Sequence, residues 1–112
     1  MRRFALLVAA AALAACSAPP NTTTLTLKNP YWKQVNVELV ITKRADCGSR
    51  GPGFVSEQKI VMYQNAMRDI AVPNDATLCW RHDRDPDKPQ PGAWSDWTRA
   101  TLTPGESAES DL

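Results

Sequence analysis

The sequence predicts an all-β fold in which two antiparallel sheets pack face to face as a β-sandwich of about seven strands. Short segments alternate between apolar and polar residues, and turn signals built on Pro, Gly, Asn and Asp recur roughly every eight to twelve residues. No segment of about ten residues combines helical periodicity with helix caps. Because each predicted strand has one apolar face, a second sheet is required to cover the first.

The first two predicted strands carry the clearest alternation. Residues 22–28 place Leu25 and Leu27 on one face and threonines on the other. Residues 34–43 place four apolar side chains on one face at a period of two, namely Val35, Val37, Leu39 and Ile41. The opposite face of this strand is marked by polar residues, namely Asn36, Glu38 and Thr42. Asn29-Pro30 supplies the turn between the two strands.

The remainder of the chain continues this pattern. We expect further strands at 57–63, 67–72, 77–83, 97–102 and, more weakly, 106–112. In the strand at 77–83, Leu78 and Trp80 share one face, while Cys79 and Arg81 share the other. Loops rich in Gly and Pro are expected at 44–53 and 85–92. The folded domain is therefore expected to span residues 22–112.

The N-terminus has the pattern of a secretory signal. Arg2 and Arg3 precede an uncharged apolar run over residues 4–15, which is shorter than the about 20 residues that a membrane-spanning helix needs. The run ends in Leu13-Ala14-Ala15-Cys16, which resembles the lipobox of bacterial lipoproteins. The resemblance implies that residues 1–15 are a cleaved signal peptide and that the thiol of Cys16 carries a lipid anchor.

The lipobox resemblance also implies a location. Ser17, rather than Asp, follows the lipidated cysteine, which in similar lipoproteins of Gram-negative bacteria favours the periplasmic face of the outer membrane. Residues 16–21 then form the lipidated cysteine and a short linker. The five residues 17–21 reach about 17–20 Å when fully extended, so the domain is expected to stay close to the membrane.

Length and charge exclude several function classes. A chain of 112 residues holds one domain and is too short for a dinucleotide-binding unit with a substrate domain or for a barrel enzyme. The 13 Lys and Arg nearly balance the 12 Asp and Glu, so the electrostatic argument for a nucleic-acid partner is missing. Loss of Arg2 and Arg3 with the signal peptide changes the formal charge from +1 to −1.

The remaining two cysteines are expected to form a disulfide. Cys47 and Cys79 would lie in an oxidising compartment, and the loop that they close is 33 residues long, counting both ends. The chain-entropy relation gives such a loop a stabilisation of about 3.7 kcal/mol. The alternative is a metal site, but two thiols and the distant His82 make a poor zinc set without a CxxC pair. We expect no metal and no cofactor.

One segment resembles a known type of domain. The run Thr77-Leu78-Cys79-Trp80-Arg81-His82-Asp83-Arg84, a Pro-rich loop and then Trp94-Ser95-Asp96-Trp97-Thr98 resemble the end of a fibronectin type III domain of cytokine receptors. In that family the Trp rings of a Trp-Ser-x-Trp-Ser motif stack on arginines of the preceding strand. The resemblance implies an Ig-like or fibronectin-like sandwich in which Arg81 and Arg84 stack on Trp94 and Trp97. Thr98 replaces the last serine of the motif, and cytokine binding is not implied.

Catalytic signals are nearly missing from the sequence. His82 is the single histidine, and Asp83 lies on the opposite face of an extended strand, where it does not orient the ring. Asp83, Asp85 and Asp87 have the spacing of a calcium loop, but Lys88 stands where the turn glycine belongs. We therefore expect a solvated loop here, and a protein that is not an enzyme.

These patterns predict a lipid-anchored, non-enzymatic adaptor or structural lipoprotein that holds a protein partner of the cell envelope near the membrane, as a monomer or within a hetero-complex. A second hypothesis is a module that binds a glycan or another small ligand through Trp94 and Trp97, with Arg81 and Arg84 beneath them. A third is a lipid-anchored inhibitor that presents the loop at 44–54 to a target enzyme. Solvent exposure of the two Trp rings separates the first two hypotheses.

Overall fold

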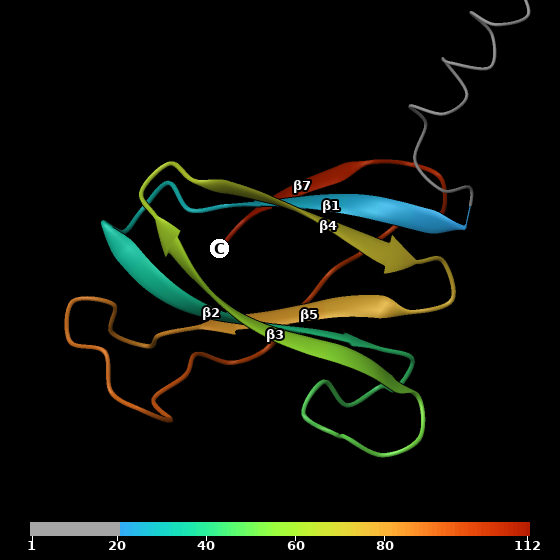
Figure 1. Cartoon of the computed structure of the whole chain (residues 1–112), viewed down its shortest axis with the longest axis horizontal. Coiled ribbons are helices and arrows are strands. Elements are labelled where there is room, and N and C mark those ends of the chain that lie inside the picture. The colour runs from blue at the N-terminus through green and yellow to red at the C-terminus, as the bar shows by residue number, and fades with distance from the viewer. Residues whose placement is uncertain (1–20) are drawn as a thin grey trace, which may run out of the picture.

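The protein is an all-β sandwich, and the computed structural model describes residues 21–112. Its seven strands are β1 (Thr22–Lys28), β2 (Gln34–Thr42), β3 (Phe54–Tyr63), β4 (Met67–Pro73), β5 (Thr77–His82), β6 (Thr98–Arg99) and β7 (Ala108–Asp111). Figure 1 shows two layers, with β4, β1 and β7 in one and β3, β2 and β5 in the other. The predicted fold class is confirmed. The predicted signal peptide, the predicted lipidation site Cys16 and the linker as far as residue 20 lie outside the described residues.

The strands form a three-stranded and a four-stranded sheet. The three-stranded sheet has the order β4-β1-β7, and the four-stranded sheet has the order β3-β2-β5-β6. Every pair is antiparallel except β1 and β7, which run parallel. The parallel pair is possible because β7 does not follow β1 through a hairpin but arrives from the other sheet. Within residues 21–112, no helix is long and apolar enough to cross a membrane.

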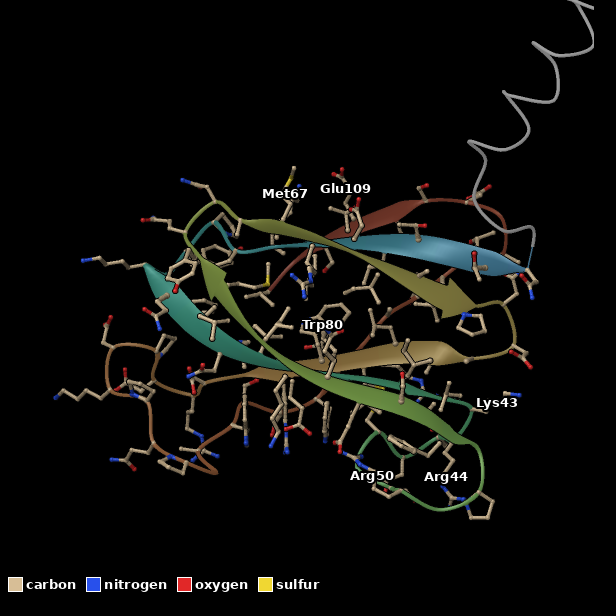
Figure 2. The ribbon with its side chains drawn as sticks, viewed as in Figure 1. Lys43, Arg44, Arg50, Met67, Trp80 and Glu109 are labelled. Atoms are coloured by element: carbon tan, nitrogen blue, oxygen red, sulfur yellow. A yellow bond between two sulfur atoms is a disulfide. The ribbon has the colours of Figure 1, made fainter. Side chains whose placement is uncertain are left out.

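The main core fills the space between the two sheets. Figure 2 shows Trp80 in this space, and Trp80 is only 2% exposed. Burial along β1 alternates as the sequence predicts, since every second residue from Thr23 onward is buried. The buried members of the core come from both sheets: Leu25, Leu27, Val35, Val37, Leu39, Met62, Val72, Leu78 and Trp80.

Several strand ends differ from the sequence-based boundaries. β2 ends at Thr42 rather than 43, and β3 begins at Phe54 rather than 57. The loop closes where the N–H of Lys43 donates to the carbonyl of Gly53, at 2.8 Å, and Gly53 has a φ of 97° that favours glycine. Pairing between β2 and β3 therefore begins directly after Gly53, with a register shift between Ile41 and Thr42.

The last two strands are shorter than predicted. β6 covers only Thr98–Arg99 rather than 97–102, and β7 covers Ala108–Asp111 rather than 106–112. After β6 the chain leaves the four-stranded sheet and crosses to the three-stranded one. Ala100 and Leu102, which were predicted as strand residues, instead pack against the edge of the core from this crossing segment.

The sandwich has two distinct ends. At the proximal end, the carbonyl of Asn21 accepts from Asn74 at 2.9 Å, and Lys43 pairs with Asp75, so the start of β1, the β4–β5 turn and the loop at 43–53 lie together. At the distal end, Asn29 donates to Ala66, so the β1–β2 loop lies against the β3–β4 turn. Figure 1 shows the proximal end at the right and the distal end at the left. The seven residues of β1 separate the two ends by about 23 Å.

Candidate functional site

The outer face of the four-stranded sheet is covered rather than solvated. The sequence predicts a polar face here, but Glu38 is 3% exposed and Thr42 is fully buried. A second apolar cluster lies on this face and consists of Val40, Cys47 and Cys79, with Phe54 and Trp97 packed against it. This cluster exists because the loop at 43–53 and the segment after β5 fold back over the sheet, where each contributes an apolar side chain.

A disulfide joins the loop to the sheet. Cys47 and Cys79 are bonded, as the sequence predicts, with their Cα atoms 6.0 Å apart. Arg99 of β6 adds two further bonds to the same loop, because its guanidinium donates to the carbonyls of Arg44 and Ala45 at 2.9 and 2.6 Å. The loop is therefore fixed to β5 and β6 by one covalent bond and two charge-assisted hydrogen bonds.

A buried carboxylate organises the charges of this face. The Oε1 atom of Glu38 accepts from Arg50 at 3.2 Å, and its Oε2 atom accepts from Arg81 at 3.0 Å. Arg50 also contacts the carboxylate of Glu57 at 2.7 Å. Figure 2 shows Arg50 on the outer side of the four-stranded sheet, away from Trp80. Burial of Glu38 is tolerated because both of its oxygens are paired with guanidinium groups.

Arg81 lies between the two tryptophans of the predicted motif. Its guanidinium carbon is 5.2 Å from the ring centroid of Trp94 and 4.4 Å from that of Trp97. The predicted stacking is therefore confirmed for Arg81 but wrong for Arg84. Arg84 lies after the strand has ended, and its guanidinium donates to the carbonyl of Trp94 at 3.2 Å instead. On the same outer face, Arg50 stacks on Phe54, with its guanidinium carbon 4.9 Å from the ring centroid. These arginines and aromatic rings form a row across the face.

A groove of about 430 Å³ opens beside this row. Its walls are the half-buried ring of Trp94, the loop at 89–92 and the outer face of β3, where Lys59 and Val61 line it. Asn36 and Asp83 form the polar part of the lining. The groove brings Trp94 together with β3 residues that the sequence did not single out, because only the sheet pairing places β3 near the loop.

Asp83 has a structural role that the sequence does not reveal. It is 4% exposed, and its Oδ2 atom accepts from the N–H of Asn36 at 2.8 Å and from the Asn36 side chain at 3.0 Å. The expectation that Asp83 belongs to a solvated loop is therefore wrong. Its carboxylate joins the end of β5 to the start of β2, next to the isolated bridge between Asp83 and Trp94. Among residues 21–112, no group of three or more potential metal ligands lies close together.

His82 is held by its neighbours rather than aimed into the groove. Its Nδ1 atom lies 2.8 Å from the carbonyl oxygen of Asp83, and its ring centroid is 4.7 Å from that of Trp32. The nearest serine in the motif, Ser95, accepts from the backbone N–H of His82 at 3.1 Å. The Asp83 carboxylate is directed at Asn36, so these three residues do not form a catalytic relay.

Exposed apolar side chains gather at the distal end. Tyr31, Tyr63 and Met67 are 57%, 62% and 68% exposed. Asn29 holds this end together, because its buried side chain donates to the carbonyls of Trp32 and Met62 and accepts from the N–H of Trp32. The sequence marks Asn29 only as a turn residue, and its role depends on the β3–β4 turn, which lies far away in the chain.

Comparison of the chain with protein-family models, with curated proteins and with solved structures returns no match.

Proposed function

We propose that the protein is a lipid-anchored, non-enzymatic adaptor that holds a protein partner of the cell envelope near the membrane. The lipid anchor is Cys16, and the partner surface is the distal end of the sandwich, at Tyr31, Tyr63 and Met67. The proposed location of the adaptor is the periplasmic face of the outer membrane, because Ser17 rather than Asp follows Cys16. Two acyl chains or more give such an anchor stable membrane attachment.

The position of the exposed apolar side chains supports this proposal. Among residues 21–112, five large apolar side chains are exposed, and three of them lie at the distal end: Tyr31, Tyr63 and Met67. The chain enters the domain at the proximal end, at Asn21. A linker of five residues keeps the proximal end at the membrane and leaves the distal end facing away from it. Tyrosine and methionine are enriched in protein interfaces, where they bury large areas in adaptable packing.

The groove beside Trp94 supports a second candidate, a small-ligand or glycan module. Trp94 and Trp97 are half-buried, and both contact Arg81, so neither ring is fully available for stacking on a sugar. Trp94 nevertheless lines the groove. A titration of the protein with short oligosaccharides, followed by Trp fluorescence, tests this candidate, and Trp94→Ala should abolish any response.

The inhibitor hypothesis receives the least support. It needs the loop at 44–54 to be rigid and to reach a target. The disulfide and Arg99 do fix the loop, but it lies at the proximal end. In the proposed arrangement the membrane-facing end is a poor place from which to engage a soluble enzyme.

The anchor is tested first. Cys16→Ser should leave the signal peptide uncleaved by the lipoprotein pathway, so the chain should lack the mass of the acyl chains and should no longer fractionate with the outer membrane. Fractionation and mass spectrometry of the native chain measure both effects. Ser17→Ala is the matched control and should change neither. Signal-peptide cleavage and outer-membrane fractionation of Cys16→Ser that both match the wild type would show that the lipid anchor does not exist.

The partner surface is tested by photocrosslinking in intact cells. A photoreactive phenylalanine in place of Tyr63 should give one defined adduct, and Tyr31→Ser with Met67→Ser should remove that adduct. The same probe in place of Asp75, which is exposed at the proximal end, is the control and should not give the adduct. Equal adducts from both positions would refute a partner surface at the distal end.

A further inference from the structure

β3 leaves a long strand edge without a partner. It is the first strand of the four-stranded sheet and pairs only with β2 in the part of the chain that the structure describes. It has ten residues, and those from Val55 to Lys59 are exposed on both faces of the sheet. A strand edge of this length can pair with another strand. The unpaired backbone N–H and C=O groups and the side chains of β3 determine which strand can pair with it.

The backbone groups of alternate residues point toward the free side. The N–H of Asn36 donates to the Asp83 side chain, and its carbonyl accepts from the Asp83 N–H, so both groups of Asn36 point toward β5. Val61 is the residue opposite Asn36 in β3. In an antiparallel pair such opposed residues direct their groups alike, so the N–H and C=O of Val61 point away from β2. By alternation, the same holds for Lys59 and Glu57.

The charges along this edge are complementary to those of a second copy of β3 that runs antiparallel to it. If Gln58 faces Gln58 of a second copy, Glu57 faces Lys59 of that copy and Lys59 faces its Glu57. This pairing joins residues whose backbone groups all point outward, as antiparallel hydrogen bonding requires. Shifting the two strands by one step of the ladder in either direction places Glu57 opposite Glu57, or Lys59 opposite Lys59, and like charges directly opposed are destabilising.

We propose that two copies of this chain associate through β3, antiparallel and with Gln58 at the two-fold axis, so that their four-stranded sheets join into one. The occupant of the edge is therefore a second copy of the same domain. Charge complementarity carries the proposal. Among the described residues, none forms an ion pair with Lys59, and Glu57 forms one, with Arg50. In the dimer each Glu57 gains Lys59 of the second copy.

The ends of the pairing segment also fit. The register shift of the β2–β3 pair leaves Val55 as an extra residue, because Ile41 faces Ser56 and Thr42 faces Phe54. This bulge limits regular pairing at one end, and the turn after Tyr63 limits it at the other. Val55 and Val61 are each 45% exposed, and the proposed register brings Val61 to Val55 of the second copy at both ends of the interface.

Cysteine crosslinking tests the register directly. Gln58→Cys places two thiols opposite each other in a non-hydrogen-bonded pair, whose Cβ atoms lie within reach of a disulfide. Ser56→Cys is the matched control, since Ser56 is equally exposed on the same face but lies about 13 Å from its own counterpart in this register. The full chain in detergent, under mild oxidation, should give a covalent dimer from Gln58→Cys with a yield at least about tenfold that of Ser56→Cys.

Charge reversal tests the pairing without cysteines. Lys59→Glu opposes two carboxylates at both sides of the axis and should raise the dimer dissociation constant about tenfold or more in sedimentation velocity. Adding Glu57→Lys restores opposite charges and should recover dimerisation. Equal crosslinking of Ser56→Cys and Gln58→Cys, or a monomeric wild-type chain at the highest concentration tested, would overturn the proposal. So would a strand of a different protein crosslinked to Gln58→Cys in cells. These outcomes leave the distal partner surface untouched.

Discussion

The outer faces of the two sheets differ in solvent exposure: the outer face of the three-stranded sheet meets water, whereas that of the four-stranded sheet is covered by loops. On the three-stranded sheet, β1 alternates strictly, and its outer face carries partly exposed polar side chains, such as Thr26, which donates to Asp69. On the four-stranded sheet, β2 has buried residues on both faces, including Glu38 and Val40. The outer face of the three-stranded sheet exposes short polar side chains to water. The outer face of the four-stranded sheet is covered by loops, which must be held to the sheet by contacts of their own.

The covered face is therefore stabilised differently from the space between the sheets. The inner core relies on apolar burial, whereas the outer cluster combines a disulfide, a buried carboxylate and arginines stacked on rings. Loops without regular pairing gain little from apolar burial alone, because ordering their backbone costs about 1–2 kcal/mol per residue. The comparison predicts that substitutions with similar chemistry have large effects on the covered face and small effects on the open one.

The disulfide should give the largest effect. Cys47→Ala with Cys79→Ala should lower the free energy of unfolding by about 3.7 kcal/mol, because the unfolded chain regains the freedom of the closed loop. Urea unfolding of the full chain, followed by Trp fluorescence, measures this value. The wild-type chain under reducing conditions is the control and should lose a similar amount. A loss below about 1 kcal/mol would show that the loop holds without its covalent bond.

The buried carboxylate should follow. Glu38→Gln leaves the guanidinium groups of Arg50 and Arg81 without their shared charge and should cost about 2–3 kcal/mol in the same unfolding experiment. The matched control is Asp69→Asn on the open face, where the exposed carboxylate accepts from Thr26, and it should stay within about 0.5 kcal/mol of wild type. Similar losses for both variants would contradict the difference between the two faces.

Ring stacking should contribute less. Arg81→Lys keeps the charge near Glu38 but removes the planar group between Trp94 and Trp97, and it should cost about 1 kcal/mol. It should also weaken the near-ultraviolet circular dichroism of the tryptophans. Arg84→Lys is the control, because Arg84 is exposed and its guanidinium donates to a backbone carbonyl, and it should leave both signals nearly unchanged.

The smallest effect concerns an exposed pair at the proximal end. The hydrogen bond from Lys43 and the charge of that lysine hold the pKa of Asp75 below its ordinary value. Because this pKa is lower in the folded state, the pair adds stability at neutral pH and loses it as the pH falls through the acidic range. In an NMR titration, Lys43→Ala should raise the pKa of Asp75 toward its ordinary value. An unchanged pKa of Asp75 would show that the ion pair is not formed in solution.

The fold was more predictable than the site. Alternation in β1 and β2 and the turn signals at Asn29-Pro30 are local features, so they identify strands without knowledge of the neighbours. The Cys47–Cys79 pair was also predictable, since only two cysteines remain after Cys16. The approach of Arg81 to both tryptophans was expected from the resemblance of this segment to a Trp-Ser-x-Trp-Ser motif. The groove was not predictable, because Trp94 and Val61 meet only through the pairing of β2 with β3 and with β5.

Arg84 and Glu38 show where local reasoning failed. The position of Arg84 relative to the rings depends on where β5 ends, and strand ends are set by competing loop hydrogen bonds rather than by residue type. Glu38 alternates like a solvated residue, but the loop at 43–53 folds over it and brings Arg50 to its carboxylate. A charge that is buried together with its partner leaves no sign in the periodicity of its own strand.

By itself, the sequence determined that this chain folds into strands with one apolar face each and that these strands need two layers. It also determined that Cys47 and Cys79 are available to form a disulfide. These properties follow from the period of side chains along a strand and from the cost of leaving apolar surface in water. Only the tertiary structure decided which outer face is covered, where the groove lies, which residues form the distal end and which edge stays unpaired. Those features depend on contacts between segments far apart in the chain, which residue type and spacing do not encode locally.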